Sequence, residues 1–169
     1  MTTLVPHPEA MIRLHLVECC VALFQDYGSA MQPTPEPSTA HDLAGIIGFT
    51  GAHIGGTLSL VSSSSLLART RPTAPVNTAE VEDWAAELAN QLLGRLKNRL
   101  LQHNVQIQLS TPVAVAGRHL ELRTLSTPLY FHSELGRLAV WFDVRFDEGF
   151  VAEQIQDGQS VAEGELELF

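Results

Sequence analysis

The side chains best placed to do chemistry lie on one predicted helix, residues 80–101. Apolar residues recur there at three- and four-residue steps, which predicts a long amphipathic helix. At 100° per residue the opposite face collects Asp83, Glu87, Asn90, Gly94 and Asn98. A carboxylate and a carboxamide that stand open to solvent on one rigid helix can orient a reactant or hold a partner without covalent chemistry.

Gly94 makes this face unusual, since a surface helix normally carries Lys, Glu or Arg there. Glycine inside a helix costs about 1 kcal/mol relative to alanine. One interpretation is that the backbone of a partner approaches closely at Gly94. The other is that the glycine is neutral, and spacing alone does not separate the two.

Other kinds of site find little support in the sequence. The seven histidines are scattered, and no Ser-His-Asp or Cys-His arrangement can be placed. His15 and Cys19 have the spacing of a metal pair, but no second pair accompanies them, so we expect no metal site. The glycines between residues 45 and 56 match neither phosphate-loop pattern, because no Lys-Ser or Lys-Thr follows them.

Composition and charge exclude several classes of partner. The chain has 169 residues, of which 45% are hydrophobic and 17% charged, and this suits one globular domain. A formal net charge of −9 argues against nucleic acid and against an anionic membrane surface. No apolar run reaches the length of a membrane span. The N-terminal residues lack a signal-peptide pattern, and a disulfide between the adjacent Cys19 and Cys20 is disfavoured, so we expect a cytoplasmic protein.

The predicted elements give an α+β fold with helices packed on an antiparallel sheet. A buried helix is expected first, at 9–27, and a proline-rich connector follows at 32–38. A hairpin is predicted at 43–50 and 54–61, followed by a short helix after serines 62–65 and by the long helix. The remaining predictions are a strand at 105–116 that is interrupted at Thr111-Pro112, a strand at 119–125, and a second hairpin at 129–132 and 137–146. Asn77 or Thr78 is expected to cap the long helix.

We divide the chain into a domain at 1–147 and an acidic C-terminal segment at 148–169. Past Arg145 there is no basic residue, while acidic residues accumulate. Such an end is either a solvated tail or a segment that docks onto a partner.

Several motifs resemble the CheC/CheX/FliY family of chemotaxis phosphatases. The signature is Asp83-x3-Glu87-x2-Asn90, followed after a helix and a strand by Pro112. Further similarity lies in the Asn-x3-Gly-x2-Lys pattern that starts at Asn90, and in residues 45–51, 111–117 and 129–146. CheC-like members carry Glu-x2-Asn on two helices, whereas the first helix here has Glu18-x2-Val21. The chain therefore resembles the CheX branch most.

The resemblance implies an activity and a partner. Members of this family dephosphorylate the phospho-aspartate of a CheY-like response-regulator receiver domain in two-component signalling. By this resemblance Asn90 orients the attacking water and Glu87 engages a lysine of the receiver. We also expect Asp83, Gln91 and Gly94 to contact the partner, with Gly94 letting the receiver seat closely. The protein has no cofactor of its own, since Mg²⁺ belongs to the receiver. CheX-type members act as homodimers joined through sheet edges.

Two alternatives remain open at the level of the sequence. The domain could bind a receiver, or dimerise, without hydrolysing the phosphate. It could also be a structural dimer with no receiver partner, in which case Glu87 and Asn90 are ordinary solvated residues.

Overall fold

The computed structural model describes residues 4–38 and 41–154. Within them, three helices pack on a seven-stranded antiparallel sheet, as the sequence predicts. The helices are α1 (Pro8–Asp26), α2 (Ser64–Thr70) and α3 (Thr78–Gln102). The strands are β1 (Gln32–Thr34), β2 (Leu43–Thr50), β3 (Ile54–Ser62), β4 (Gln108–Leu109), β5 (Val113–Ala116), β6 (Leu129–Ser133) and β7 (Gly136–Phe146).

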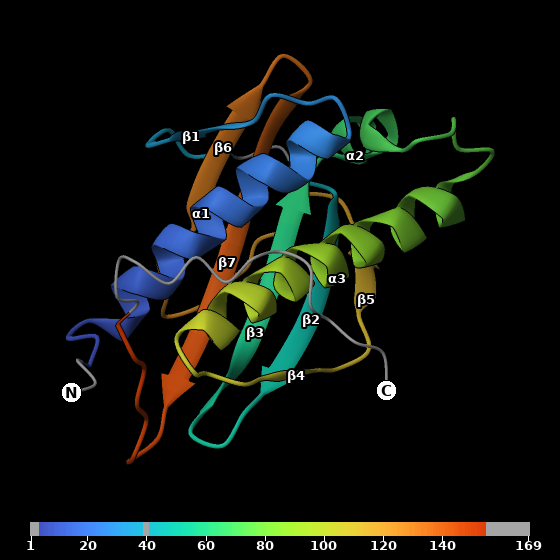
Figure 1. Cartoon of the computed structure of the whole chain (residues 1–169). Helices are drawn as coiled ribbons and strands as arrows, with labels where there is room; N and C mark the ends of the chain where they lie inside the picture. Colours follow the sequence, from blue (N-terminus) through green and yellow to red (C-terminus); the bar gives the residue numbers. More distant parts are fainter. Residues whose placement is uncertain (1–3, 39–40, 155–169) are drawn as a thin grey trace, which may run out of the picture.

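The sheet has the order β1-β6-β7-β3-β2-β4. β4 and β5 pair with the same edge of β2, β5 with its first residues, 43–46, and β4 with its last two, 49–50. α1 and α3 lie side by side across one face of this sheet (Figure 1). The main core lies between these helices and the sheet, where fully buried Leu16, Leu92 and Phe142 come from α1, α3 and β7. Burial of this apolar area is the principal force that holds α3 in place.

α3 follows the predicted pattern. Its apolar stripe is buried, and the Asn77 side chain caps the start by accepting a hydrogen bond from the Glu80 backbone N–H at 3.0 Å. The cap is therefore Asn77 rather than Thr78. With the stripe fixed against the sheet, the rotation of α3 about its axis is fixed as well, and the polar face must point outward.

Gly45 of β2 permits the closest approach between α3 and the sheet. A Cβ atom at Gly45 would lie 2.0 Å from the Ala85 carbonyl oxygen, much closer than real Cβ contacts. This glycine is thus a packing requirement, because no side chain fits between β2 and α3 at this position.

Two predictions of local structure are wrong. Residues 119–125 form no strand, although Leu120 and Leu122 are half-buried between exposed neighbours. Among the described residues no strand pairs with this segment to form a ladder, and His119 has a φ of 55°, which is not a strand conformation. Conversely, the proline-rich connector contains β1, because β6 provides a partner for three of its residues.

The part of the C-terminal segment that the structure describes lies against the domain. Ala152 is 3% exposed, and Glu153 forms a bridge with Leu4. Residues 155–169 lie outside the described residues, so the domain boundary stays a prediction. No helix in 4–38 and 41–154 is long and apolar enough to cross a membrane.

Candidate functional site

The outward face of α3 carries the predicted site residues at successive turns. Asp83 and Glu87 are exposed, while Asn90, Gln91 and Gly94 are half-buried. Glu87 and Asn90 are three residues apart, a spacing that makes side chains neighbours on a helix surface. The structure therefore brings the predicted carboxylate and amide together on one solvent-facing strip.

The Asn90 amide faces outward on α3 without support from the residues that the structure describes. Within the described part of the chain, its side chain makes no hydrogen bond, whereas the next residue, Gln91, makes two. An amide offers two N–H donors and an oxygen acceptor. Those groups are available to a water molecule or to a bound partner.

The Glu87 carboxylate is held on one side only. Gln91 donates from Nε2 to Glu87 Oε1 at 2.8 Å, and the Tyr27 hydroxyl donates to Gln91 Oε1 at 2.8 Å. No hydrogen bond to Glu87 Oε2 occurs among residues 4–38 and 41–154. One carboxylate oxygen is therefore anchored and the other stays free for a partner.

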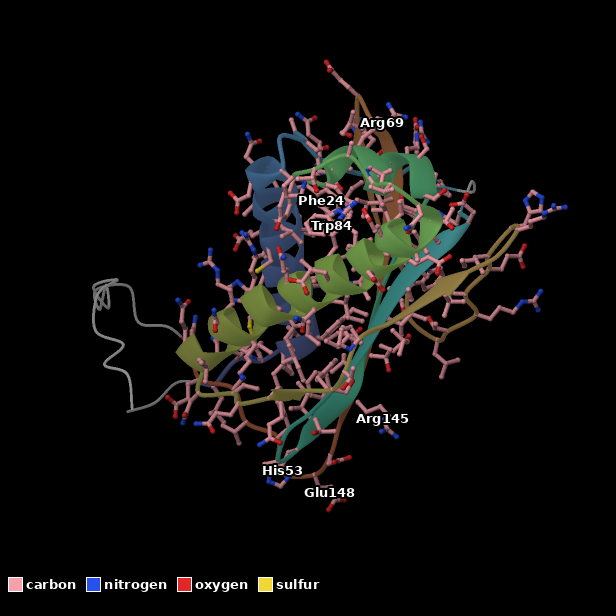
Figure 2. All side chains as sticks on the ribbon, turned by 90° about the vertical axis from the view of Figure 1, so that its right-hand side faces the viewer. Phe24, His53, Arg69, Trp84, Arg145 and Glu148 are labelled. Atoms are coloured by element: carbon pink, nitrogen blue, oxygen red, sulfur yellow. The ribbon has the colours of Figure 1, made fainter. Side chains whose placement is uncertain are left out.

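The Tyr27 side chain is held in place by contacts with α3 and, through Trp84, with α2. Its ring meets Trp84 edge-on, with 4.9 Å between ring centroids and an interplanar angle of 86°. Trp84 Nε1 donates to Thr70 Oγ1 at 3.0 Å, so this contact reaches α2 (Figure 2 labels Trp84). The ion pair between Asp26 and Arg95 ties the end of α1 to α3 next to it. All three helices thus contribute to placing the Tyr27 hydroxyl.

Gly94 is not required by the packing of the domain. Among the described residues, a Cβ atom there would meet no atom within 4 Å outside the adjacent backbone of α3. The open space one turn beyond Asn90 leaves room for a partner to approach, which is one of the two interpretations offered by the sequence.

The histidine of the possible metal pair has a different partner. The Nε2 atoms of His15 and His103 lie 2.8 Å apart, and His103 Nδ1 donates to the Glu153 carbonyl oxygen at 2.7 Å. Burial lowers the pKa of His15, although a hydrogen bond with Glu18 opposes that effect. Burial also raises the pKa of the Cys19 thiol. Across the described residues no group of three or more His, Cys, Asp or Glu side chains could hold a metal ion.

A cavity of about 900 Å³ lies elsewhere on the sheet. Its lining includes Thr57, Asp143 and Arg145, and none of the five α3 site residues. Figure 2 shows Arg145 at the end of the molecule away from Trp84. The candidate site thus lies on the outward face of α3 and not in this cavity, an arrangement suited to a protein partner.

Tyr27 is the site component that sequence reasoning misses. It ends α1 and lies 64 residues before Gln91. No periodicity links the two positions, because their contact depends on how α1 and α3 pack. The available signal is a tyrosine at a helix end, which is too common to identify a site.

The sequence matches the family model described as Chemotaxis phosphatase CheX over residues 43–132, more than half of the chain. That region includes β2, β3 and all of α3 with its five predicted site residues, while Tyr27 lies before it. No curated protein matches the sequence significantly.

Solved structures of CheX proteins have the same fold. The chemotaxis protein CheX from Vibrio vulnificus matches with a TM-score of 0.72 and 21% sequence identity, over 79% of this chain and 96% of that one. CheX from Desulfovibrio desulfuricans matches with a TM-score of 0.67 and 17% identity, over 80% and 99%. A CheX-CheY-BeF3-Mg²⁺ complex from Borrelia burgdorferi matches with a TM-score of 0.65 and 14% identity, over 79% and 97%. Together with the family match, these observations assign the chain to the CheX family of chemotaxis phosphatases.

Proposed function

We propose that this protein is a phosphatase that hydrolyses the aspartyl phosphate of a CheY-like receiver domain. The observation that carries the proposal is the pairing of exposed Glu87 with the uncommitted amide of Asn90 on the outer face of α3. Membership of the CheX family supports the reaction class. The Borrelia complex, which contains a CheX together with CheY, supports the class of partner.

In the proposed reaction, water attacks the phosphorus atom and the bond between phosphorus and the aspartyl oxygen breaks. The products are the free carboxylate of the receiver and inorganic phosphate, which takes up the oxygen of the water. Asn90 accepts a hydrogen bond from the water and holds it in line with the bond that breaks. Phosphoryl transfer depends mainly on such positioning and on the stabilisation of charge.

Glu87 binds the partner in this scheme. Its free Oε2 engages a lysine of the receiver, which fixes the receiver against α3 and places the phosphoryl group near Asn90. Mg²⁺ belongs to the receiver, so this chain contributes no metal ligand. Asp83 and Gly94, on the same face, complete the contact surface.

The energetic demand on this surface is small. An acyl phosphate is already labile, and a hundredfold acceleration corresponds to about 2.7 kcal/mol of transition-state stabilisation. One positioned hydrogen-bonding group has an effect of about this size in other enzymes. An open helix face can therefore be sufficient without a deep pocket.

The proposal is tested with a set of phosphorylated receiver domains and catalytic amounts of this protein. We expect inorganic phosphate to appear faster from at least one receiver, with many turnovers per molecule of protein. Binding that leaves the lifetime of the phosphate unchanged would instead support a non-catalytic CheX-like module. Absence of both binding and turnover across the set would leave only a structural role for the domain.

A further inference from the structure

We propose that Tyr27 is a positioning residue that acts on Glu87 through Gln91, and this inference rests on the proposed phosphatase function. The sequence pattern assigns Gln91 to contact with the partner and assigns no role to Tyr27. In the structure both ends of the Gln91 amide are used within the domain, one by Tyr27 and the other by Glu87.

The chemistry of the three groups fixes the direction of the hydrogen bonds. An ionised carboxylate can only accept, so Gln91 must turn its NH₂ group toward Glu87. That orientation leaves Gln91 Oε1 facing Tyr27, whose hydroxyl must then donate. A reversed amide would place Gln91 Oε1 against the carboxylate, where the two acceptors repel. Glu87 thus sets the orientation of the Gln91 amide, and the Tyr27 hydroxyl, acting as donor, stabilises the far end of the amide in that orientation.

The consequence for the site is a pre-positioned carboxylate. A free glutamate on a helix surface samples several rotamers, and a partner must restrict them when it binds. Here Oε1 is held by Gln91 while Oε2 remains open. Because Glu87 binds the receiver and Asn90 positions the water, loss of this support should act on KM more than on kcat.

Tyr27 can be tested without disturbing its packing. A Tyr27→Phe substitution keeps the ring that meets Trp84 edge-on and removes only the hydroxyl. Tyr130 offers a matched control, since it is the other tyrosine of the chain, is half-buried on β6, and makes no side-chain hydrogen bond within the described structure. Tyr130→Phe removes the same atom at a position remote from α3.

We expect Tyr27→Phe to raise KM for the phosphorylated receiver about three- to tenfold and to change kcat less than about twofold, the range that the ordering of one side chain can provide. Tyr130→Phe should match the wild type. In a Glu87→Ala background, Tyr27→Phe should have no further effect, because the group that it positions is absent. A purely structural role would lower activity in both backgrounds.

Gln91→Met separates this inference from direct contact of Gln91 with the receiver. If Gln91 contacted the partner directly and Tyr27 had no role, Gln91→Met would raise KM while Tyr27→Phe kept the wild-type KM. That result would overturn the inference. An equal loss from Tyr27→Phe with and without Glu87 would also overturn it.

The side-chain amide of Gln91 provides a readout that does not depend on activity. In ¹⁵N-labelled protein, the side-chain N–H resonances of Gln91 are assigned by their loss in Gln91→Met. In the wild type these protons should exchange slowly with solvent, and in Tyr27→Phe their chemical shifts should move toward those of a free glutamine amide. If the wild type released no phosphate, the proposed function would fail, and this signal would still decide whether Tyr27 orients Gln91. Unchanged resonances in Tyr27→Phe would contradict the inference directly.

Discussion

At the scale of single residues, Glu87 and Asn90 differ in exposure and in hydrogen bonding. Glu87 is exposed yet anchored through Gln91, while Asn90 is half-buried yet has no hydrogen-bond partner among the described residues. This difference suits their proposed roles. A carboxylate that binds a partner benefits from being held in place, whereas an amide that binds water must keep its hydrogen-bonding groups free.

Gly94 gives a prediction in which stability and activity move in opposite directions. Gly94→Ala should increase the free energy of unfolding by up to about 1 kcal/mol, because alanine favours the helix and its Cβ would clash with nothing in the described part of the chain. The same change should weaken dephosphorylation if a receiver seats closely there. Urea unfolding and receiver turnover measure the two effects. Gly28→Ala is the control and should decrease the free energy of unfolding, because Gly28 has a φ of 75°, which alanine adopts only with strain.

His15 predicts a pH dependence of stability. Its pKa is lowered in the folded protein, chiefly by burial, so the unfolded chain binds a proton more readily as the pH falls below about 6.5. The free energy of unfolding should therefore decrease from that point down to the folded pKa. The neighbouring charges are Glu18, which raises the pKa of His15, and Arg99 and His103, which lower it.

Urea unfolding at pH 7.5 and pH 5.5 measures this effect. His15→Gln should lose less stability between the two conditions than the wild type, because a glutamine N–H can still face His103 and does not titrate. Exposed His132 provides the control, and His132→Gln should retain the wild-type loss. Equal losses in His15→Gln and the wild type would contradict the assignment.

At the scale of elements, the contact between α3 and β2 sets the position of the site. Gly45→Ala should destabilise the domain by about 1–3 kcal/mol or more, because the new Cβ would overlap the Ala85 carbonyl and force α3 away from the sheet. Gly55→Ala on β3 is the control, since its Cβ would meet Phe49 at an ordinary 3.5 Å. Thermal unfolding of both variants compares the two positions, and similar melting temperatures would argue against the tight contact.

The elements also show what the sequence could and could not predict. Periodicity located α3 and its polar face, because this helix has one buried side with a regular repeat. Apolar runs separated by turn residues located both hairpins. Periodicity failed at residues 119–125, where alternation exists without a partner strand, and at β1, whose pairing with β6 depends on a distant segment. The same limit applies to Tyr27, whose contact with Gln91 follows from the packing of α1 on α3.

At the scale of the whole molecule, the two edges of the sheet differ. The β1 edge has three residues and includes Pro33, which lacks a backbone N–H, so it offers little for pairing. β5, on the outer side of β2 (Figure 1), presents Val113 and Val115 at 53% and 41% exposure. If the protein is a homodimer joined through a sheet edge, β5 is the edge that we expect to pair.

Sedimentation velocity tests this assembly. The wild type should sediment as a dimer, and Val115→Lys should shift it toward monomer, because a charge on an edge strand opposes strand pairing. Val76→Lys is the control, since Val76 is 85% exposed in the segment before α3 and belongs to no strand. A wild-type monomer, or a Val115→Lys dimer as stable as the wild type, would contradict this arrangement.

The lifetime of a phosphorylated receiver in the presence of Asn90→Ala tests the account most directly. Asn98→Ala is the matched control, because Asn98 is an exposed asparagine further along the same helix. We predict that Asn90→Ala loses the acceleration by about two orders of magnitude or more while keeping its circular dichroism spectrum and melting temperature, and that Asn98→Ala stays within about twofold of the wild type. Turnover by Asn90→Ala at the wild-type rate would show that the amide does not position the attacking water.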